Sequence, residues 1–132
     1  MNIKTSQHLV EEAKKKIVTL PPKEVKDLYE KGEVNLVDIR DIRELENEGS
    51  VDGAIHIPRG MLEFWLDPES SYYKANKIQD IKKMVLFCAL GWRSALATKS
   101  LVDMGFNNVA HVDGGFDALK KSGLKIIEKE KK

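Results

Sequence analysis

One cysteine follows a run of apolar residues and comes just before a predicted helix. The segment MVLFCALGWRSALATKSL (84–101) contains Cys88, the only cysteine of the 132-residue chain. The thiolate is the nucleophilic form of cysteine, and the N–H groups and dipole at a helix N-terminus stabilise an anion placed there. The position of Cys88 therefore predicts a reactive sulfur, provided that this sulfur is both anionic and accessible.

Three residues that follow Cys88 fit this chemistry. Gly91 lets the loop backbone take conformations that other residues rarely adopt, which would turn its amides inward. Arg93 adds a permanent positive charge suited to an anionic substrate, and Ser94 could cap the helix or donate its hydroxyl to the sulfur. The alternative is that Cys88 is an inert, small apolar residue at the end of a core strand. The glycine and arginine at these positions favour the reactive thiol.

The composition predicts one globular domain. Hydrophobic residues make up 42% and charged residues 33% of the chain, and its length suits a single core. A formal net charge of +1 gives no field that would attract nucleic acid or an anionic membrane. One cysteine cannot form an internal disulfide, and the first residues lack the apolar run of a signal peptide. We therefore expect a cytoplasmic protein with no nucleic-acid or membrane partner.

Strand and helix patterns alternate along the chain. Apolar runs of strand length lie at 16–20, 34–39, 53–58, 84–88 and 108–112. Helical patterns lie at 5–15, 21–32, 41–49, 61–66, 79–83, 93–104 and 116–123. This order predicts an α/β domain with a mainly parallel central sheet of about five strands and helices on both faces. Ligands sit beyond the carboxyl ends of such strands, where both Asp38 and Cys88 are placed.

Four motifs occur together in the order and spacing of one known family. They are LVDIR (36–40), EGSVDGAIHIP (48–58), CALGWR (88–93) followed by Ser94, and HVDGGFDAL (111–119). In these motifs the chain resembles the single-domain rhodanese family of thiosulfate and related sulfurtransferases, whose active loop runs six residues from cysteine to arginine. The resemblance covers about residues 16–125 and implies a rhodanese-like domain there. Residues 1–15 would form an N-terminal helical extension and residues 126–132 a charged C-terminal tail.

Two departures from the family pattern concern structural positions rather than the thiol. Ser50 and Val51 stand where the family often has histidine and isoleucine. Leu119 occupies a place that is often tryptophan, and we expect a change of packing there.

The resemblance implies a two-step sulfur transfer through Cys88. The thiolate would take sulfur from a small anionic donor such as thiosulfate and become a persulfide. A thiophilic acceptor, which could be cyanide, a thiol or a carrier protein, would then remove that sulfur. The amides of the loop would hold the anionic persulfide, and they belong to Ala89, Leu90, Gly91, Trp92 and Arg93. Arg93 could also steer the donor.

The resemblance requires no cofactor and no metal. The three histidines, His8, His56 and His111, are scattered in the sequence without the spacing of metal ligands.

Residues outside the loop have open roles. We expect Asp38 to hydrogen-bond loop amides or an arginine, and Arg40 to join a surface ion network with neighbouring carboxylates. Arg43 could either contact substrate or pair at the surface. The segment 58–66 could cover the site, although its large apolar residues fit core packing better. Trp92 either braces the loop or forms an apolar lip that selects acceptors, and we favour the lip.

Two other functions remain open. Cysteine phosphatases and arsenate reductases also place a cysteine-to-arginine loop at a helix N-terminus, but with five intervening residues. Here four residues intervene, which makes a smaller cradle suited to sulfur. The other alternative is a module with little turnover that relays sulfur to a partner or senses oxidants.

Overall fold

Five parallel strands form the centre of the molecule in the computed structural model, which describes residues 2–77 and 83–129. The strands lie in the order β1-β6-β5-β2-β4. Their bounds are β1 Thr19–Leu20, β2 Val34–Asp38, β4 Ile55–His56, β5 Lys83–Phe87 and β6 Val109–Val112. The predicted α/β fold with a five-stranded parallel sheet is therefore confirmed.

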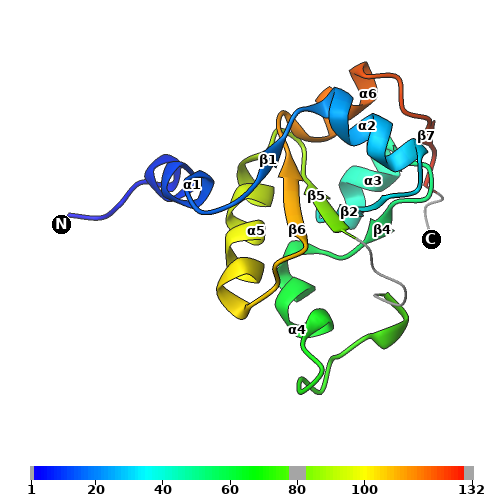
Figure 1. The fold of residues 1–132 in the computed structure, drawn as a ribbon. Coiled ribbons are helices and arrows are strands. Elements are labelled where there is room, and N and C mark those ends of the chain that lie inside the picture. Colours follow the sequence, from blue (N-terminus) through cyan, green and yellow to red (C-terminus); the bar gives the residue numbers. More distant parts are fainter. Residues whose placement is uncertain (1, 78–82, 130–132) are drawn as a thin grey trace.

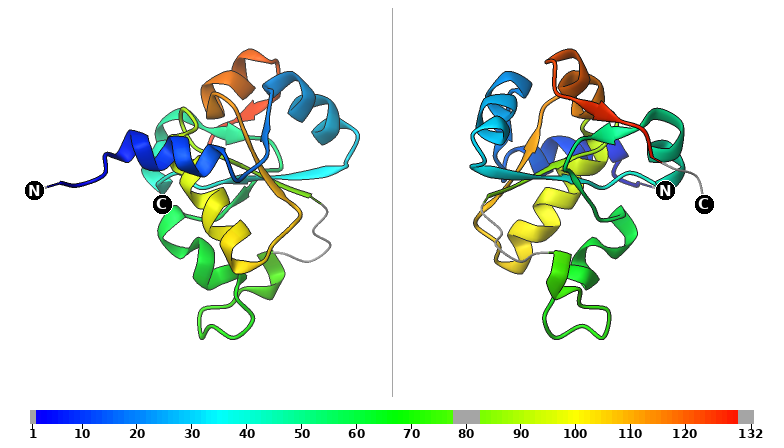
Figure 2. Two further views of the ribbon diagram at one scale, coloured as in Figure 1. Left: turned by 60° about the vertical axis from the view of Figure 1, so that its left-hand side comes forward. Right: turned by 90° about the vertical axis from the view of Figure 1, so that its right-hand side faces the viewer.

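Helices cover both faces of this sheet (Figures 1 and 2). Their bounds are α1 Ser6–Lys14, α2 Pro22–Glu30, α3 Ile42–Glu48, α4 Leu62–Leu66, α5 Trp92–Met104 and α6 Gly115–Lys121, with 3-10 turns η1 Arg59–Met61 and η2 Ala75–Lys77. Side chains of α2 and α6 enter one apolar cluster, and those of α4 and α5 enter the other. Each face of the sheet thus has its own core.

The alternation of side chains along β5 decides toward which face of the sheet Cys88 points. Val85 and Phe87 belong to the cluster under α2 and α6, whereas Leu86 and Cys88 belong to the cluster under α4 and α5. Successive side chains of a strand point to opposite faces, so this pattern follows from the strand itself. The Cys88 side chain is therefore directed toward α5.

Two short strands were not predicted from the sequence. β3 (Ser50–Val51) pairs antiparallel with β7 (Ile126–Ile127), which joins the start of the predicted charged tail to the domain. Strands of two residues carry too little alternation to be recognised in a sequence. The helical turn predicted at 79–83 lies almost wholly outside the described residues, and Lys83 begins β5.

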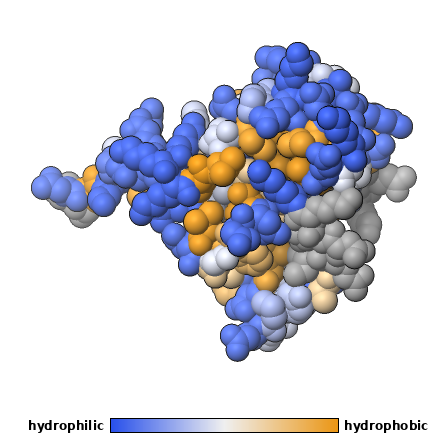
Figure 3. All heavy atoms as spheres, viewed as in Figure 1, coloured by the Kyte–Doolittle hydropathy of each residue, from blue (hydrophilic) through white to orange (hydrophobic). Residues whose placement is uncertain are grey.

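The N-terminal helix α1 packs against α5, and the chain before it extends away from the body (Figure 1). Thr5 caps α1 by accepting a hydrogen bond from the amide of His8. Val10 and Ala13 are buried, so one face of α1 is covered. Figure 3 shows apolar side chains gathered in the middle of this side of the molecule, between the hydrophilic surfaces of α1 and α2. No helix in residues 2–77 or 83–129 is long and apolar enough to cross a membrane.

A buried ion pair joins the end of β2 to α3 and β3. The Arg40 side chain is fully buried and donates to both carboxylate oxygens of Asp38, through Nη2 at 2.8 Å and Nε at 3.0 and 3.3 Å. Arg40 also donates to Glu48 and to the carbonyl of Gly49, and Ser50 donates its hydroxyl to Asp38. The predicted surface network for Arg40 is therefore wrong, because its side chain and that of Asp38 are both fully buried.

We expect Arg40→Met to lower the free energy of unfolding by about 3–5 kcal/mol, because it leaves the Asp38 carboxylate buried without its partner. Urea denaturation monitored by circular dichroism measures this change. Arg43→Met is the matched control, since Arg43 is exposed and pairs with Asp41 at the surface. Solvent screens that exposed pair, so its loss should leave the free energy of unfolding nearly unchanged. Equal losses in the two variants would contradict the structural role of Arg40.

Candidate active site

The loop between β5 and α5 folds around the sulfur of Cys88. The amide of Gly91 donates to Sγ at 3.1 Å and the amide of Ser94 at 3.4 Å, and the Ser94 Oγ lies 3.6 Å from Sγ. Gly91 is the N-cap of α5 and has a φ of 108°, a left-handed conformation that favours glycine. Glycine at this position lets the chain turn into α5 with N–H groups aimed at the sulfur. The described amide donors to Sγ are Gly91, one of the five loop residues whose amides were expected to hold the persulfide, and Ser94, whose amide was not among them.

The first turn of α6 holds the loop from the other side. Phe116 donates its amide to the carbonyl of Cys88 at 2.7 Å, and Asp117 donates to that of Ala89 at 3.4 Å. Gly115 makes this approach possible, because a Cβ there would lie 2.5 Å from the Cys88 carbonyl oxygen. The carbonyls of the loop are thus bound by α6 while amides face the sulfur.

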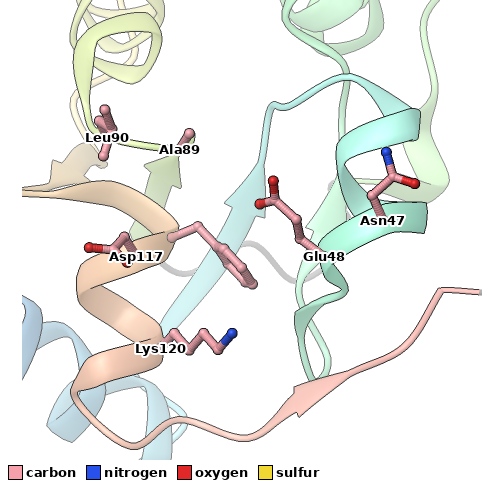
Figure 4. A pocket seen from close by; sticks show the side chains of 7 residues that line it. Asn47, Glu48, Ala89, Leu90, Asp117 and Lys120 are labelled. Carbon is pink, nitrogen blue, oxygen red and sulfur yellow. The ribbon is translucent and has the colours of Figure 1, made fainter.

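The sulfur is less accessible than the sequence led us to expect. Cys88 is only 1% exposed, because its side chain points toward α5 beneath the loop. An open cavity of about 470 Å³ lies beside the loop, between α3 and α6 (Figure 4). Ala89 and Leu90 line it, but Cys88 does not. The loop therefore lies between the sulfur and this cavity.

Arg93 is held by a carboxylate of α3. Its two terminal nitrogens donate to the two oxygens of Glu44 at 2.7 and 3.0 Å. These hydrogen bonds lower the pKa of Glu44 and raise the pKa of Arg93. Arg93 remains 42% exposed along its side chain, so its charge is partly compensated but still reaches solvent.

A buried histidine extends the hydrogen bonds of the site away from the sulfur. The Nδ1 of His111 lies 3.0 Å from Ser94 Oγ, and its Nε2 lies 2.8 Å from Thr19 Oγ1. Burial lowers the pKa of His111 to about 4, and the charge of Lys14 acts in the same direction against that of Asp113. His111 is therefore a neutral ring at neutral pH.

The other predicted residues lie outside the contacts of Sγ. Asp38 accepts hydrogen bonds from Arg40. A bond to an arginine was one of the two roles predicted for Asp38. Arg43 is 81% exposed and pairs with Asp41, so the structure places it in a surface pair.

Trp92 is 66% exposed at the start of α5, as an apolar lip requires. In the segment 58–66, Trp65 packs against the same apolar cluster as Cys88, whereas Phe64 is 51% exposed, so the predicted core packing holds for only part of this segment.

Sequence reasoning missed Glu44, His111 and Thr19. His111 carried a signal, because it is the one polar residue of the strand VAHV (109–112), which ends beside the Cys88 loop. Glu44 was expected only as one of the carboxylates of a surface ion network, and in the structure it completes a capping box with Asp41. Its second role, as the partner of Arg93, depends on a contact between residues 49 positions apart in sequence. Within the described part of the chain, no cluster of three or more His, Cys, Asp or Glu residues could hold a metal ion.

A model of the rhodanese-like domain matches residues 21–122, which is most of the chain. The chain belongs to the rhodanese family. It is 35% identical over 98 residues to the thiosulfate sulfurtransferase GlpE of Pseudomonas savastanoi, and the match covers 74% of this chain and 82% of that protein. Relatives of this kind support sulfur transfer as the general activity of this rhodanese domain.

Two solved structures share the fold over nearly the whole chain. A protein of unknown function from Rhodopseudomonas palustris, described as a possible tyrosine phosphatase, is 43% identical, with a TM-score of 0.89 and coverage of 96% of this chain and 97% of that one. The polysulfide-sulfur transferase homodimer of Wolinella succinogenes is 34% identical, with a TM-score of 0.71 and coverage of 92% and 85%. Other relatives are longer: the chain spans 62% of a mouse thiosulfate sulfurtransferase/rhodanese-like domain-containing protein and 24% of MoeZ of Mycobacterium tuberculosis.

We expect His111 to make the stability of this rhodanese domain depend on pH. Its pKa is about 4 in the folded state and 6.5 in an ordinary histidine, so between these values the unfolded chain binds more protons. The free energy of unfolding should therefore fall as the pH drops from 6.5 toward 4, by about 2–3 kcal/mol from this residue alone. Urea denaturation of wild type and His111→Asn at several pH values measures this contribution.

The variant should show a flatter slope in that interval. His8→Asn, at an exposed position of α1, should keep the wild-type slope. Identical slopes in wild type and His111→Asn would mean that His111 does not stay neutral in the folded state.

Proposed function

We propose that the chain is a sulfurtransferase that moves sulfane sulfur from an anionic donor such as thiosulfate to a thiophilic acceptor, through a persulfide on Cys88. The observation that carries this proposal is the convergence of the Gly91 and Ser94 amides on the sulfur of the only cysteine. N–H groups aimed at one sulfur atom favour its anionic forms, which are the thiolate before transfer and the persulfide after it.

The reaction consists of two displacements at sulfur. The Cys88 thiolate attacks the outer sulfur of thiosulfate, a new S–S bond forms, and the S–S bond of thiosulfate breaks as sulfite leaves with the electron pair. The acceptor then attacks the outer sulfur of the persulfide, and the Cys88 thiolate leaves. Covalent catalysis of this kind replaces one direct transfer with two easier steps.

Access to the sulfur requires a local movement of the loop. The Cys88 side chain is buried, while Leu90 is 56% exposed at the tip of the loop and lines the cavity beside it. A shift of residues 89 and 90 would open the sulfur toward this cavity. Arg93 lies at the other end of the loop, where its partly exposed charge suits an anionic donor.

A relay module remains the nearest alternative to an enzyme. The exposed side chains of Leu90 and Trp92 beside the buried thiol suit a protein acceptor as well as a small thiol. Comparing the transfer rates to small thiols and to candidate carrier proteins separates the two, because a relay would transfer sulfur to a carrier and turn over poorly with small thiols.

A phosphatase is the second candidate, because one similar structure is described as a possible tyrosine phosphatase. Its chemistry would need an arginine free to bind two phosphate oxygens at once. In this chain both terminal nitrogens of Arg93 already donate to Glu44. The loop also has four residues between Cys88 and Arg93, one fewer than the phosphatase loop. Both features favour sulfur transfer.

We expect wild-type protein incubated with thiosulfate to gain the mass of one sulfur atom, located on Cys88 by peptide mass spectrometry. Cys88 is the only cysteine, so the adduct has one possible thiol. Cys88→Ser should gain no sulfur and should lose all transfer to cyanide, while its circular dichroism stays unchanged because the two side chains are similar in volume. Transfer activity that persists in Cys88→Ser would refute the assignment of Cys88.

We also expect no hydrolysis of a generic aryl phosphate that depends on Cys88. Release of the aryl alcohol is measured in wild type and in Cys88→Ser under the same conditions, and the two rates should be equal. A wild-type rate clearly above that of the variant would favour the phosphatase instead.

A further inference from the structure

Four residues form a continuous hydrogen-bonded chain from the catalytic sulfur to the edge of the sheet. Sγ of Cys88 lies 3.6 Å from Ser94 Oγ, which lies 3.0 Å from His111 Nδ1, and His111 Nε2 lies 2.8 Å from Thr19 Oγ1. Cys88, Ser94 and His111 are buried, whereas Thr19 is exposed on the edge strand β1. The thiol is thus linked to the surface through hydrogen bonds although its own side chain is covered.

Each member of this chain can both donate and accept a hydrogen bond, so the chain has two consistent directions. In the first direction, the thiol donates to Ser94, the Ser94 hydroxyl donates to Nδ1, and the Nε2–H group donates to Thr19. In the second direction, Thr19 donates to Nε2, the Nδ1–H group donates to Ser94, and Ser94 donates to the sulfur. Only the second direction gives a thiolate a hydroxyl donor.

We propose that His111 is a tautomer switch that reverses this chain when Cys88 loses its proton. One proton moves along every hydrogen bond: from Sγ to Ser94 Oγ, from Ser94 to Nδ1, from Nε2 to Thr19 Oγ1, and from the Thr19 hydroxyl to solvent. The net change is the transfer of one proton from the buried thiol to water. His111 is neutral before and after the change, but as the opposite tautomer.

The surroundings of His111 suit such a switch. Its pKa of about 4 keeps the ring uncharged at neutral pH, where two neutral tautomers compete. The charged groups that act on the ring are Lys14 of α1 and Asp113 after β6, while its register partners are Leu86 on β5 and Thr19 on β1. His111 acts on the sulfur through Ser94, so it is a positioning residue rather than a catalytic one.

This inference deepens the proposed function, because the thiolate is the species that would attack the donor. The tautomer switch can be tested without measuring sulfur transfer.

Nitrogen-15 NMR of the histidine rings distinguishes Nδ1–H from Nε2–H tautomers. It is recorded across the pH range in which Cys88, the only thiol, becomes reactive toward iodoacetamide. We expect His111 to change from the Nε2–H to the Nδ1–H tautomer over that same range.

Two variants interrupt the chain and one serves as control. In both Cys88→Ala and Ser94→Ala, His111 should keep one tautomer over the whole pH range. In Ser94→Ala, the alkylation of Cys88 should also slow about tenfold, because the thiolate loses a hydroxyl donor. Ser100→Ala, on the same helix but outside the chain, should behave as wild type. A constant tautomer in wild type, a doubly protonated ring in that range, or a change that persists in Ser94→Ala would overturn the proposal. If Ser94→Ala does not fold, wild type and Cys88→Ala decide between these outcomes.

Discussion

The burial of the Arg40 guanidinium is the constraint on which the rest of the site depends. A buried cation must have its donors satisfied, and here Asp38, Glu48 and the carbonyl of Gly49 satisfy them. The guanidinium carbon also lies 4.0 Å from the ring centroid of Phe116, at the start of α6. Arg40 thereby fixes β2, the end of α3 and the first turn of α6 relative to one another. Because that turn of α6 binds the carbonyls of the Cys88 loop, the position of the loop depends on a charge that never contacts it.

The burial of the thiol changes what the surrounding hydrogen bonds can do. In a poorly solvated site, amide donors stabilise a charge more strongly than they would in water. The same burial blocks direct loss of a proton to solvent and direct approach of a donor molecule. The loop shift proposed at residues 89 and 90 and the proposed hydrogen-bonded path through His111 would meet these two needs separately. The shift of the loop would let the donor molecule reach the sulfur, and the path through His111 would carry the proton to solvent.

Features that depend on neighbouring residues in the sequence could be predicted, and features that depend on distant residues could not. The alternation of strands and helices, and the turn from Cys88 to Ser94, depend on neighbours in sequence, so both were predictable. Arg40, Glu44 and His111 were not, because their roles depend on partners brought together only by the folded sheet. Arg40 was misjudged for a physical reason: the charged residues after it predict a surface segment, whereas Asp38 draws its side chain inward. The accessibility of Sγ was misjudged because strand alternation turns Cys88 toward α5.

The balance of charge around the sulfur favours a particular kind of anion. Arg93 is paired with Glu44, Arg40 with Asp38 and Glu48, and His111 is neutral. The groups that donate to Sγ are the amides of Gly91 and Ser94, whose dipoles stabilise one negative charge. Bidentate binding of a phosphate group would need both terminal nitrogens of Arg93, and these already donate to Glu44. A thiolate or a persulfide carries a single charge on a single atom, and it requires no such exchange.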